Sequence, residues 1–203
     1  MTGIFAAWLA HLLAAASPGP AILLAARTGV TQGFRTGLCL CIGLALGAMI
    51  WAMAALFGMA ALFALAPALF WAFKLTGAAF LIWIAIGMWR HAREPMVLDA
   101  PDVATPSSAW AAFRLGLLAQ LANPKPAVFF GAVFVAAVPP GSSPAVIALL
   151  LVLVFANEMF CTLAVARAFS AKAPRAAYLR FKTWIDRAFG SALAGLGVKL
   201  AAT

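Results

Sequence analysis

Charged residues are scarce in this chain of 203 residues. Asp, Glu, Lys and Arg make up only 9% of it, whereas soluble domains carry about 25%. Hydrophobic residues make up 66%, and the mean hydropathy is +1.05. Apolar runs of about 20 residues recur, each long enough to cross a bilayer as a helix. The sequence therefore predicts an all-α membrane protein, with residues 1–203 forming a single transmembrane domain and leaving no room for a soluble one.

The chain also lacks the usual sequence signatures of catalysis and of metal binding. Cys39, Cys41 and Cys161 are odd in number, lie in apolar runs and form no CxxC pair, so we interpret them as packing residues. No Ser/His/Asp or Cys/His constellation, phosphate-binding loop or metal-ligand spacing is present. We therefore expect neither a metal nor a cofactor, and Glu158 with His11 is the one conceivable pair for an intramembrane enzyme.

Acidic residues number only five, which leaves a net charge of +9. Such a charge can indicate nucleic-acid binding, but here the basic residues lie between the apolar runs, where the positive-inside rule explains them. No nucleic-acid partner is predicted. The N-terminus has no basic region before its apolar run, and Ser17-Pro18-Gly19-Pro20 interrupts that run, so we expect no cleavable signal.

The apolar runs predict six transmembrane helices. Their approximate ranges are 4–26, 38–62, 68–89, 111–138, 144–167 and 185–202. Most Lys and Arg residues lie in the first, third and fifth connections, which we therefore place in the cytoplasm, with both termini in the periplasm. The third connection, about 90–110, is the longest and divides the chain into halves of about 1–90 and 111–203.

Two similar motifs interrupt the first and the fourth predicted span. Ser17-Pro18-Gly19-Pro20 aligns without a gap with Asn123-Pro124-Lys125-Pro126. Ser and Asn are favoured helix N-caps, and proline is tolerated at the first helical position. We interpret each motif as a helix that stops and restarts, so that the restarted half presents free N–H groups and a positive dipole end.

Span parity adds a topological prediction. Three spans precede the long connection and three follow it, so two such repeats enter the membrane in opposite directions. Inverted repeats with interrupted helices that meet near the midplane are a recurring plan of secondary transporters. The predicted fold is therefore two inverted three-helix repeats, with broken helices one and four running antiparallel.

Glu158 is the only acidic residue deep within a predicted span, and Lys125 follows one of the interruptions. Ionised side chains at such depth are costly, and they commonly mark transport pathways. Glu158 is a candidate for proton exchange or for binding a substrate ammonium group. The alternatives are a static ion pair with Lys125 or a neutral, hydrogen-bonded carboxyl group. Lys125 would in turn favour a substrate carboxylate.

The remaining candidates are polar or small residues of the same spans. Gln120 lies on the same helix face as Asn123 and is predicted either to line the cavity or to bond a neighbouring helix. His11 and Asn157 are candidates for a pathway or for helix–helix hydrogen bonds. Gly43 and Gly47 form a GxxxG pair, typical of close helix packing or of a substrate path. The predicted substrate-binding residues are Ser17, Pro18, Gly19, Pro20, Gln120, Asn123, Pro124 and Lys125; the pathway candidates are His11, Gly43, Gly47, Trp51 and Asn157.

An ordered set of short motifs resembles a known family. The set comprises Ser17-Pro-Gly-Pro20, Gly33-Phe-Arg-Thr-Gly37, the glycines of the second span, Lys74-Leu-Thr-Gly-Ala-Ala-Phe-Leu-Ile-Trp83, Asn123-Pro-Lys125 with Phe129-Phe130, and Ile185-Asp186-Arg187 with Gly190. Together they resemble the lysine exporter and homoserine/threonine exporter family of bacterial inner-membrane proteins, over nearly the whole chain.

The resemblance implies efflux of amino acids or close analogues, driven by the proton gradient or the membrane potential, by a homodimer. It also places Glu158 where family members often carry an acidic residue. Many members have another acidic residue after the second-span glycine, where this chain has Ala48, so no coupling role transfers to that position. An exporter of another solute or ion, an intramembrane enzyme and a non-transporting scaffold remain as alternatives.

Overall fold

The computed structural model describes residues 2–65, 68–95, 106–134, 138 and 141–202, and all regular elements among them are helical. The all-α prediction is therefore confirmed for these residues. In chain order the elements are α1 (Thr2–Ala16), α2 (Pro20–Leu65), α3 (Ala68–His91), α4 (Ala109–Leu121), α5 (Pro124–Val128), the π-helix η1 (Phe129–Phe134), α7 (Pro144–Phe169) and α8 (Lys172–Ala202).

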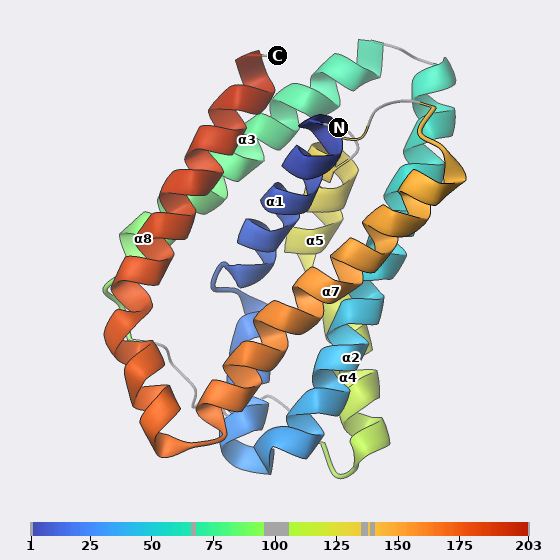
Figure 1. Ribbon diagram of the computed structural model, residues 1–203. Coiled ribbons are helices and arrows are strands. Elements are labelled where there is room, and N and C mark those ends of the chain that lie inside the picture. The colour runs from blue at the N-terminus through green and yellow to red at the C-terminus, as the bar shows by residue number, and fades with distance from the viewer. Residues whose placement is uncertain (1, 66–67, 96–105, 135–137, 139–140, 203) are drawn as a thin grey trace.

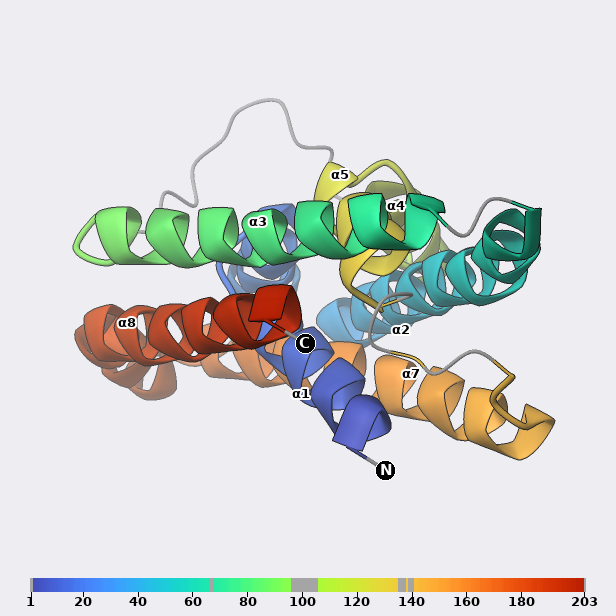
Figure 2. The same cartoon turned by 90° about the horizontal axis from the view of Figure 1, so that it is seen from above.

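The helices form two groups with the interrupted segments between them. α2 packs along α4 and α7, and α3 packs along α8. α1 lies between these groups and contacts both α7 and α8, while η1 contacts α3 and α2. Figure 1 shows α1 and α5 in the centre of the molecule, with both termini at the same end, and Figure 2 shows the α3–α8 pair from above.

Two described helices are long and apolar enough to cross a membrane by length and composition, namely the Pro20–Gly58 part of α2 and Pro144–Phe169. Large apolar side chains are also exposed on the outside of the bundle. Trp83 on α3, Phe160 on α7 and Trp184 on α8 are 67%, 71% and 70% exposed. An outer surface of this kind suits lipid as the surrounding medium.

The predicted helix boundaries agree best in the middle of the chain. α3 and α7 match the predicted spans 68–89 and 144–167 to within two residues. In contrast, α2 continues through the predicted loop between residues 26 and 38, and α8 begins at Lys172 instead of about residue 185. The charged stretch from Lys172 to Trp184 is rich in alanine and other helix formers, so this segment is helical although it was predicted as loop. Residues 27–37 contain three glycines and three threonines, so helix propensity does not explain the helix there. Part of the long third connection lies outside the described residues.

Gly33 bends α2 within the predicted first loop. Its backbone has φ 76° and ψ −179°, which is not helical, while both flanking segments are. A side chain is disfavoured at such a φ, and glycine adopts it without a steric penalty. The bend separates the first part of α2, which follows α1, from the long part that packs against α4 and α7.

Glycines allow α2 and α4 to approach closely. A Cβ atom added to Gly43 would overlap the carbonyl oxygen of Phe113, and one added to Gly116 would overlap the carbonyl oxygen of Leu40. Gly47 similarly lies against the side chain of Gln120. The backbone contact between the two helices therefore depends on glycine from both sides, and it fixes the position of the end of α4.

We predict that Gly116→Ala lowers the stability of the folded protein by roughly 1–3 kcal/mol, because the added methyl group forces α2 and α4 apart. The thermal unfolding temperature in detergent measures this effect. Gly195→Ala is the matched control, since an added Cβ there meets no heavy atom within 4 Å. Equal unfolding temperatures for the two variants would contradict the assigned contact.

Candidate functional site

The first helix interruption, Ser17–Gly19, separates α1 from α2. Ser17 closes α1, because its backbone N–H and its hydroxyl both donate to the Ala14 carbonyl oxygen, at 3.2 and 2.7 Å. The N–H of Leu23 donates to the carbonyl of Gly19 at 2.9 Å, so α2 begins at Pro20. The prediction that Ser17 caps the restarted helix is therefore wrong. Gly19 occupies the cap position, and Pro20 is the first helical residue in place of Pro18.

The second helix interruption, Ala122–Asn123, separates α4 from α5. Asn123 is the N-cap, since its side-chain oxygen accepts from the backbone N–H of Lys125 at 3.1 Å, and Pro124 is the first helical residue. These two parts of the prediction are confirmed. However, Pro124 and Pro126 have no backbone N–H, and the backbone N–H of Lys125 already donates to the Asn123 side chain. The first turn of α5 thus offers fewer free donors than expected, and the N–H groups of Ala21 and Ile22 in the first turn of α2 are better placed to meet a ligand.

Lys125 joins the two interruptions. Its ammonium group donates to the carbonyl oxygen of Ser17 at 3.1 Å and also to the Ser17 hydroxyl oxygen. The Ser17 hydroxyl hydrogen is directed to Ala14, so its oxygen is free to accept. An ammonium group has three donors, and no third partner of Lys125 is present among the described residues. One N–H therefore remains for a ligand.

Glu158 of α7 faces the ends of the helices that precede the two interruptions. Its Oε1 accepts from Nε2 of Gln120 on α4 at 3.1 Å, and its Oε2 lies 3.8 Å from Nε2 of His11 on α1. Glu158 is only 4% exposed, and Gln120 and His11 are equally buried. Within the described part of the chain no oxygen of Glu158 lies within 4.0 Å of the Lys125 ammonium nitrogen, so the alternative of a static ion pair is not a direct contact.

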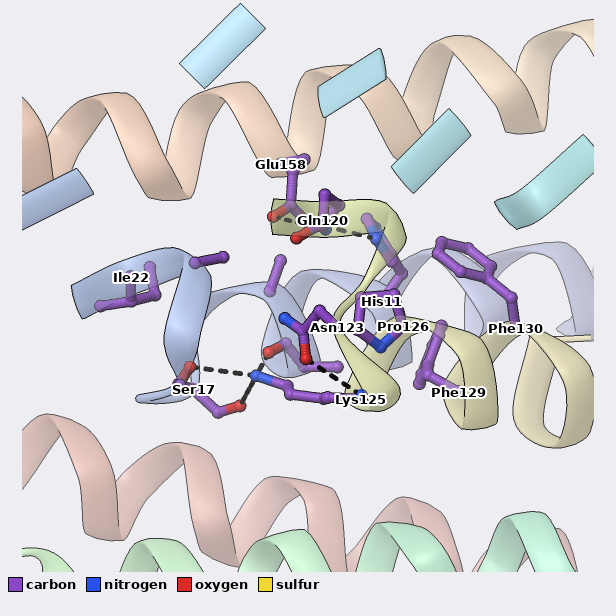
Figure 3. A pocket seen from close by; sticks show the side chains of 14 residues that line it. His11, Ser17, Ile22, Gln120, Asn123, Lys125, Pro126, Phe129, Phe130 and Glu158 are labelled. Carbon is purple, nitrogen blue, oxygen red and sulfur yellow. Dashed lines mark hydrogen bonds and ion pairs between the residues drawn. The ribbon is translucent and has the colours of Figure 1, made fainter. Parts of the chain in front are cut away.

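A cavity of about 390 Å³, counting its open side, lies between these groups. It is lined by His11, Ala14, Ala15, Ser17, Gly19, Ala21, Ile22, Gln120, Asn123, Lys125, Pro126, Phe129, Phe130 and Glu158. Figure 3 shows Lys125 beside Ser17 on one side of it, and Glu158 beside Gln120 on another.

Some predicted site residues lie beside this cavity instead of lining it. Gly43 and Gly47 pack α2 against α4, and Nε1 of Trp51 donates to the backbone carbonyl of Gln120 at 3.3 Å. Asn157 donates to the backbone carbonyl of Trp8 at 3.1 Å, which is a helix–helix hydrogen bond. Pro18, Pro20 and Pro124 belong to the interruptions but are absent from the lining.

The apolar wall of the cavity was missed by sequence reasoning. Ile22, Pro126, Phe129 and Phe130 line it, and His11 packs against both phenylalanine rings, with centroids 5.6 and 5.2 Å apart. Phe129 and Phe130 were noted only as part of a family motif. Nearly every position in these segments is apolar, so the sequence has no periodicity that separates a cavity-facing residue from a lipid-facing one.

Loss of the Asn123 cap has a predictable cost. We expect Asn123→Ala to lower stability by about 1 kcal/mol, because the backbone N–H of Lys125 loses its acceptor. Asn123→Ser, which keeps an acceptor oxygen, should retain most of the wild-type unfolding temperature. A serine variant that is as unstable as the alanine variant would show that the cap is not what Asn123 contributes.

Comparison with known proteins agrees with this organisation. The model of the LysE type translocator family matches residues 12–203. The threonine efflux protein of Escherichia coli K12 is 29% identical over 194 residues, covering 95% of this chain and 94% of that protein. The homoserine/homoserine lactone efflux protein of Salmonella typhimurium LT2 is 29% identical over 131 residues, covering 63% and 62%.

No solved structure matches the chain. The family match covers both interruptions, Glu158 and nearly all of the chain, and its members are translocators, not enzymes. The protein therefore belongs to the LysE type translocator family of membrane proteins.

Proposed function

We propose that this protein exports an amino acid or a close analogue across the bacterial inner membrane. The observation that carries the proposal is the separation of two oppositely chargeable groups around one cavity, a buried carboxyl group and a half-buried ammonium group. Lys125 and Glu158 both line it, yet each is held by other residues and they make no direct ion pair. A zwitterion that carries a carboxylate and an ammonium group complements such a pair, and the related efflux proteins are named for threonine and homoserine.

The contacts suggest an orientation for the substrate. Its carboxylate meets the remaining N–H of Lys125 and the first turn of α2 at Ala21 and Ile22, where the dipole is positive. Its ammonium group points toward Glu158 on the opposite side of the cavity. The side chain then lies against Phe129 and Phe130, which form the apolar wall.

Alternating access would come from rocking of one inverted repeat, about 1–90, against the other, about 111–203. The support is that the two interrupted helices run in opposite directions in Figure 1 and that Lys125 ties one to the other. Motion of either repeat would open the cavity to one side of the membrane. In this proposal the long connection is cytoplasmic, both termini are periplasmic and the transporter works as a homodimer.

Glu158 couples transport to protons in this scheme. An ionised Glu158 attracts the substrate ammonium group, whereas a protonated Glu158 no longer does, so proton entry from the periplasm promotes release and reset. The membrane potential supplies the driving force together with the proton gradient. Buried carboxyl groups that exchange protons are a recurring feature of transporters.

We predict that purified protein in proteoliposomes catalyses counterflow of a labelled small amino acid, tested against a panel with and without a pH gradient. Cations without a carboxylate should neither be transported nor compete. Transport of an inorganic ion alone would favour the ion-exporter alternative, and no flux of any solute would favour a scaffold. Either result would overturn the proposal.

Glu158→Gln should remain folded, because Gln120 and His11 can still contact the amide. This variant should lose stimulation of efflux by a pH gradient, and any substrate flux that remains should no longer depend on pH. Lys125→Met, which keeps a side chain of similar length, should instead weaken substrate binding at every pH, because the carboxylate loses its cation. Wild-type efflux by Glu158→Gln across the pH range would contradict the coupling role.

A further inference from the structure

Asn157 is buried beside the cavity without lining it, and its contacts determine the hydrogen-bonding state of His11. Its side-chain nitrogen lies 3.1 Å from the carbonyl oxygen of Trp8 and 3.3 Å from Nδ1 of His11. Asn157 and His11 are 6% and 3% exposed, so water does not substitute for these contacts. The two residues come from α7 and α1, which pack together along this stretch.

The orientation of the Asn157 amide follows from the chemistry of its neighbours. A backbone carbonyl only accepts hydrogen bonds, so the group that faces Trp8 must be the amide nitrogen and not the amide oxygen. The second hydrogen on this nitrogen points to Nδ1 of His11. An amide nitrogen is not an acceptor, so Nδ1 must accept and carries no proton. The proton of the neutral imidazole therefore lies on Nε2, which faces Glu158 at 3.8 Å.

Glu158 is consequently faced by two N–H donors. Nε2 of Gln120 donates to one carboxylate oxygen at 3.1 Å, and the Nε2–H of His11 is directed at the other across a gap that is longer than a hydrogen bond. An ionised carboxylate, which only accepts, suits both neighbours. A protonated one has an O–H that needs an acceptor, and one of the two contacts must then change.

We propose that Asn157 and His11 are positioning residues that direct the response to Glu158 protonation toward Gln120. His11 cannot turn into an acceptor, because Asn157 holds its tautomer and Trp8 holds Asn157. Gln120 can become an acceptor for the Glu158 O–H, because its Oε1 is buried and has no hydrogen-bond partner among the described residues. Rotation of the carboxamide by half a turn lets Oε1 accept from the Glu158 O–H and turns Nε2 away. This inference rests on the proposed role of Glu158 as the proton site.

The rotation has a direct consequence for the substrate. Gln120 lines the cavity three residues before the second interruption. With Glu158 ionised, the oxygen of Gln120 is buried without a partner, and a small turn of the carboxamide would offer it to a substrate ammonium group in the cavity. After protonation that acceptor is occupied by Glu158. A single proton therefore removes two attractions for the substrate ammonium group, one at Glu158 and one at Gln120.

Other titratable groups surround Glu158 and belong in any pH analysis. His11 faces it from α1, Cys41 from α2 and Lys125 from α5, while Cys161 lies on α7 itself. Cys161 donates to the carbonyl of Leu12, so it does not compete for Nδ1 of His11. None of these groups accepts from Nε2 of His11 at a shorter distance than Glu158 among the described residues.

Nitrogen-15 NMR of histidine-labelled protein in bilayers tests the tautomer directly. The chain has only two histidines, and His91→Gln assigns their signals. At about pH 8.5, where an exposed histidine is neutral, we expect His11 to be protonated on Nε2 alone. His91 is an internal contrast, because its Nδ1 lies 2.8 Å from the carbonyl of Gly87 and must donate to it. A proton on Nδ1 of His11 would overturn the proposal.

Asn157→Leu tests the consequence. The variant should lose the single tautomer of His11 and shift the pH midpoint of efflux by about one unit or more. Thr162→Val is the control, since the Thr162 hydroxyl donates to the Glu158 backbone carbonyl at 2.6 Å and also meets the Cys41 side chain. No hydrogen bond between described residues joins it to His11 or Asn157, so the His11 tautomer should stay unchanged. An unchanged pH midpoint together with a mixed tautomer would refute the link to Glu158. Failure of the transport proposal is separate, because it would appear as absence of wild-type counterflow while the NMR result stands.

Discussion

The bond between Lys125 and Ser17 is the interaction on which the site depends. These residues are 108 positions apart, and each lies at a place where a helix stops and another begins. A half-buried cation that has lost part of its water needs acceptors from the protein, and Ser17 at the end of α1 supplies two. The interruption in one half of the chain thus satisfies the charge in the other. The cavity lies where the two halves meet, because the Lys125 ammonium group at one interruption finds its acceptors at the other.

Glu158 has the corresponding role on the opposite side of the cavity. Gln120, near the end of α4, donates to it, and His11 of α1 faces it. The neighbouring Asn157 joins α7 to α1 through a hydrogen bond to the Trp8 carbonyl. Every polar side chain in this network belongs to an interrupted helix or to α7. The glycine contacts between α2 and α4 hold this arrangement in place. A change of charge at Glu158 therefore first alters the contacts of the segments that would move relative to one another during transport.

Sequence reasoning reached the two interruptions, Lys125, Glu158 and the all-helical class, because proline, charge and hydropathy are strong local signals. It placed the N-cap of α2 at Ser17, since serine is a favoured cap, and did not foresee that the Ser17 hydroxyl is used by α1 instead. It left open a static pair between Lys125 and Glu158, because charge alone does not show that other groups contact each of them more closely. The tautomer of His11 and the apolar wall at Phe129 depend on contacts between distant helices, for which a nearly uniform apolar sequence carries no pattern.

The most direct test of the shared cavity is cysteine crosslinking between positions 17 and 125. Ser17→Cys and Lys125→Cys would be combined in a background that lacks Cys39, Cys41 and Cys161, and treated in bilayers with a short thiol-specific crosslinker. We expect a crosslink between the two positions within one chain. Absence of the crosslink in folded protein would contradict a shared cavity.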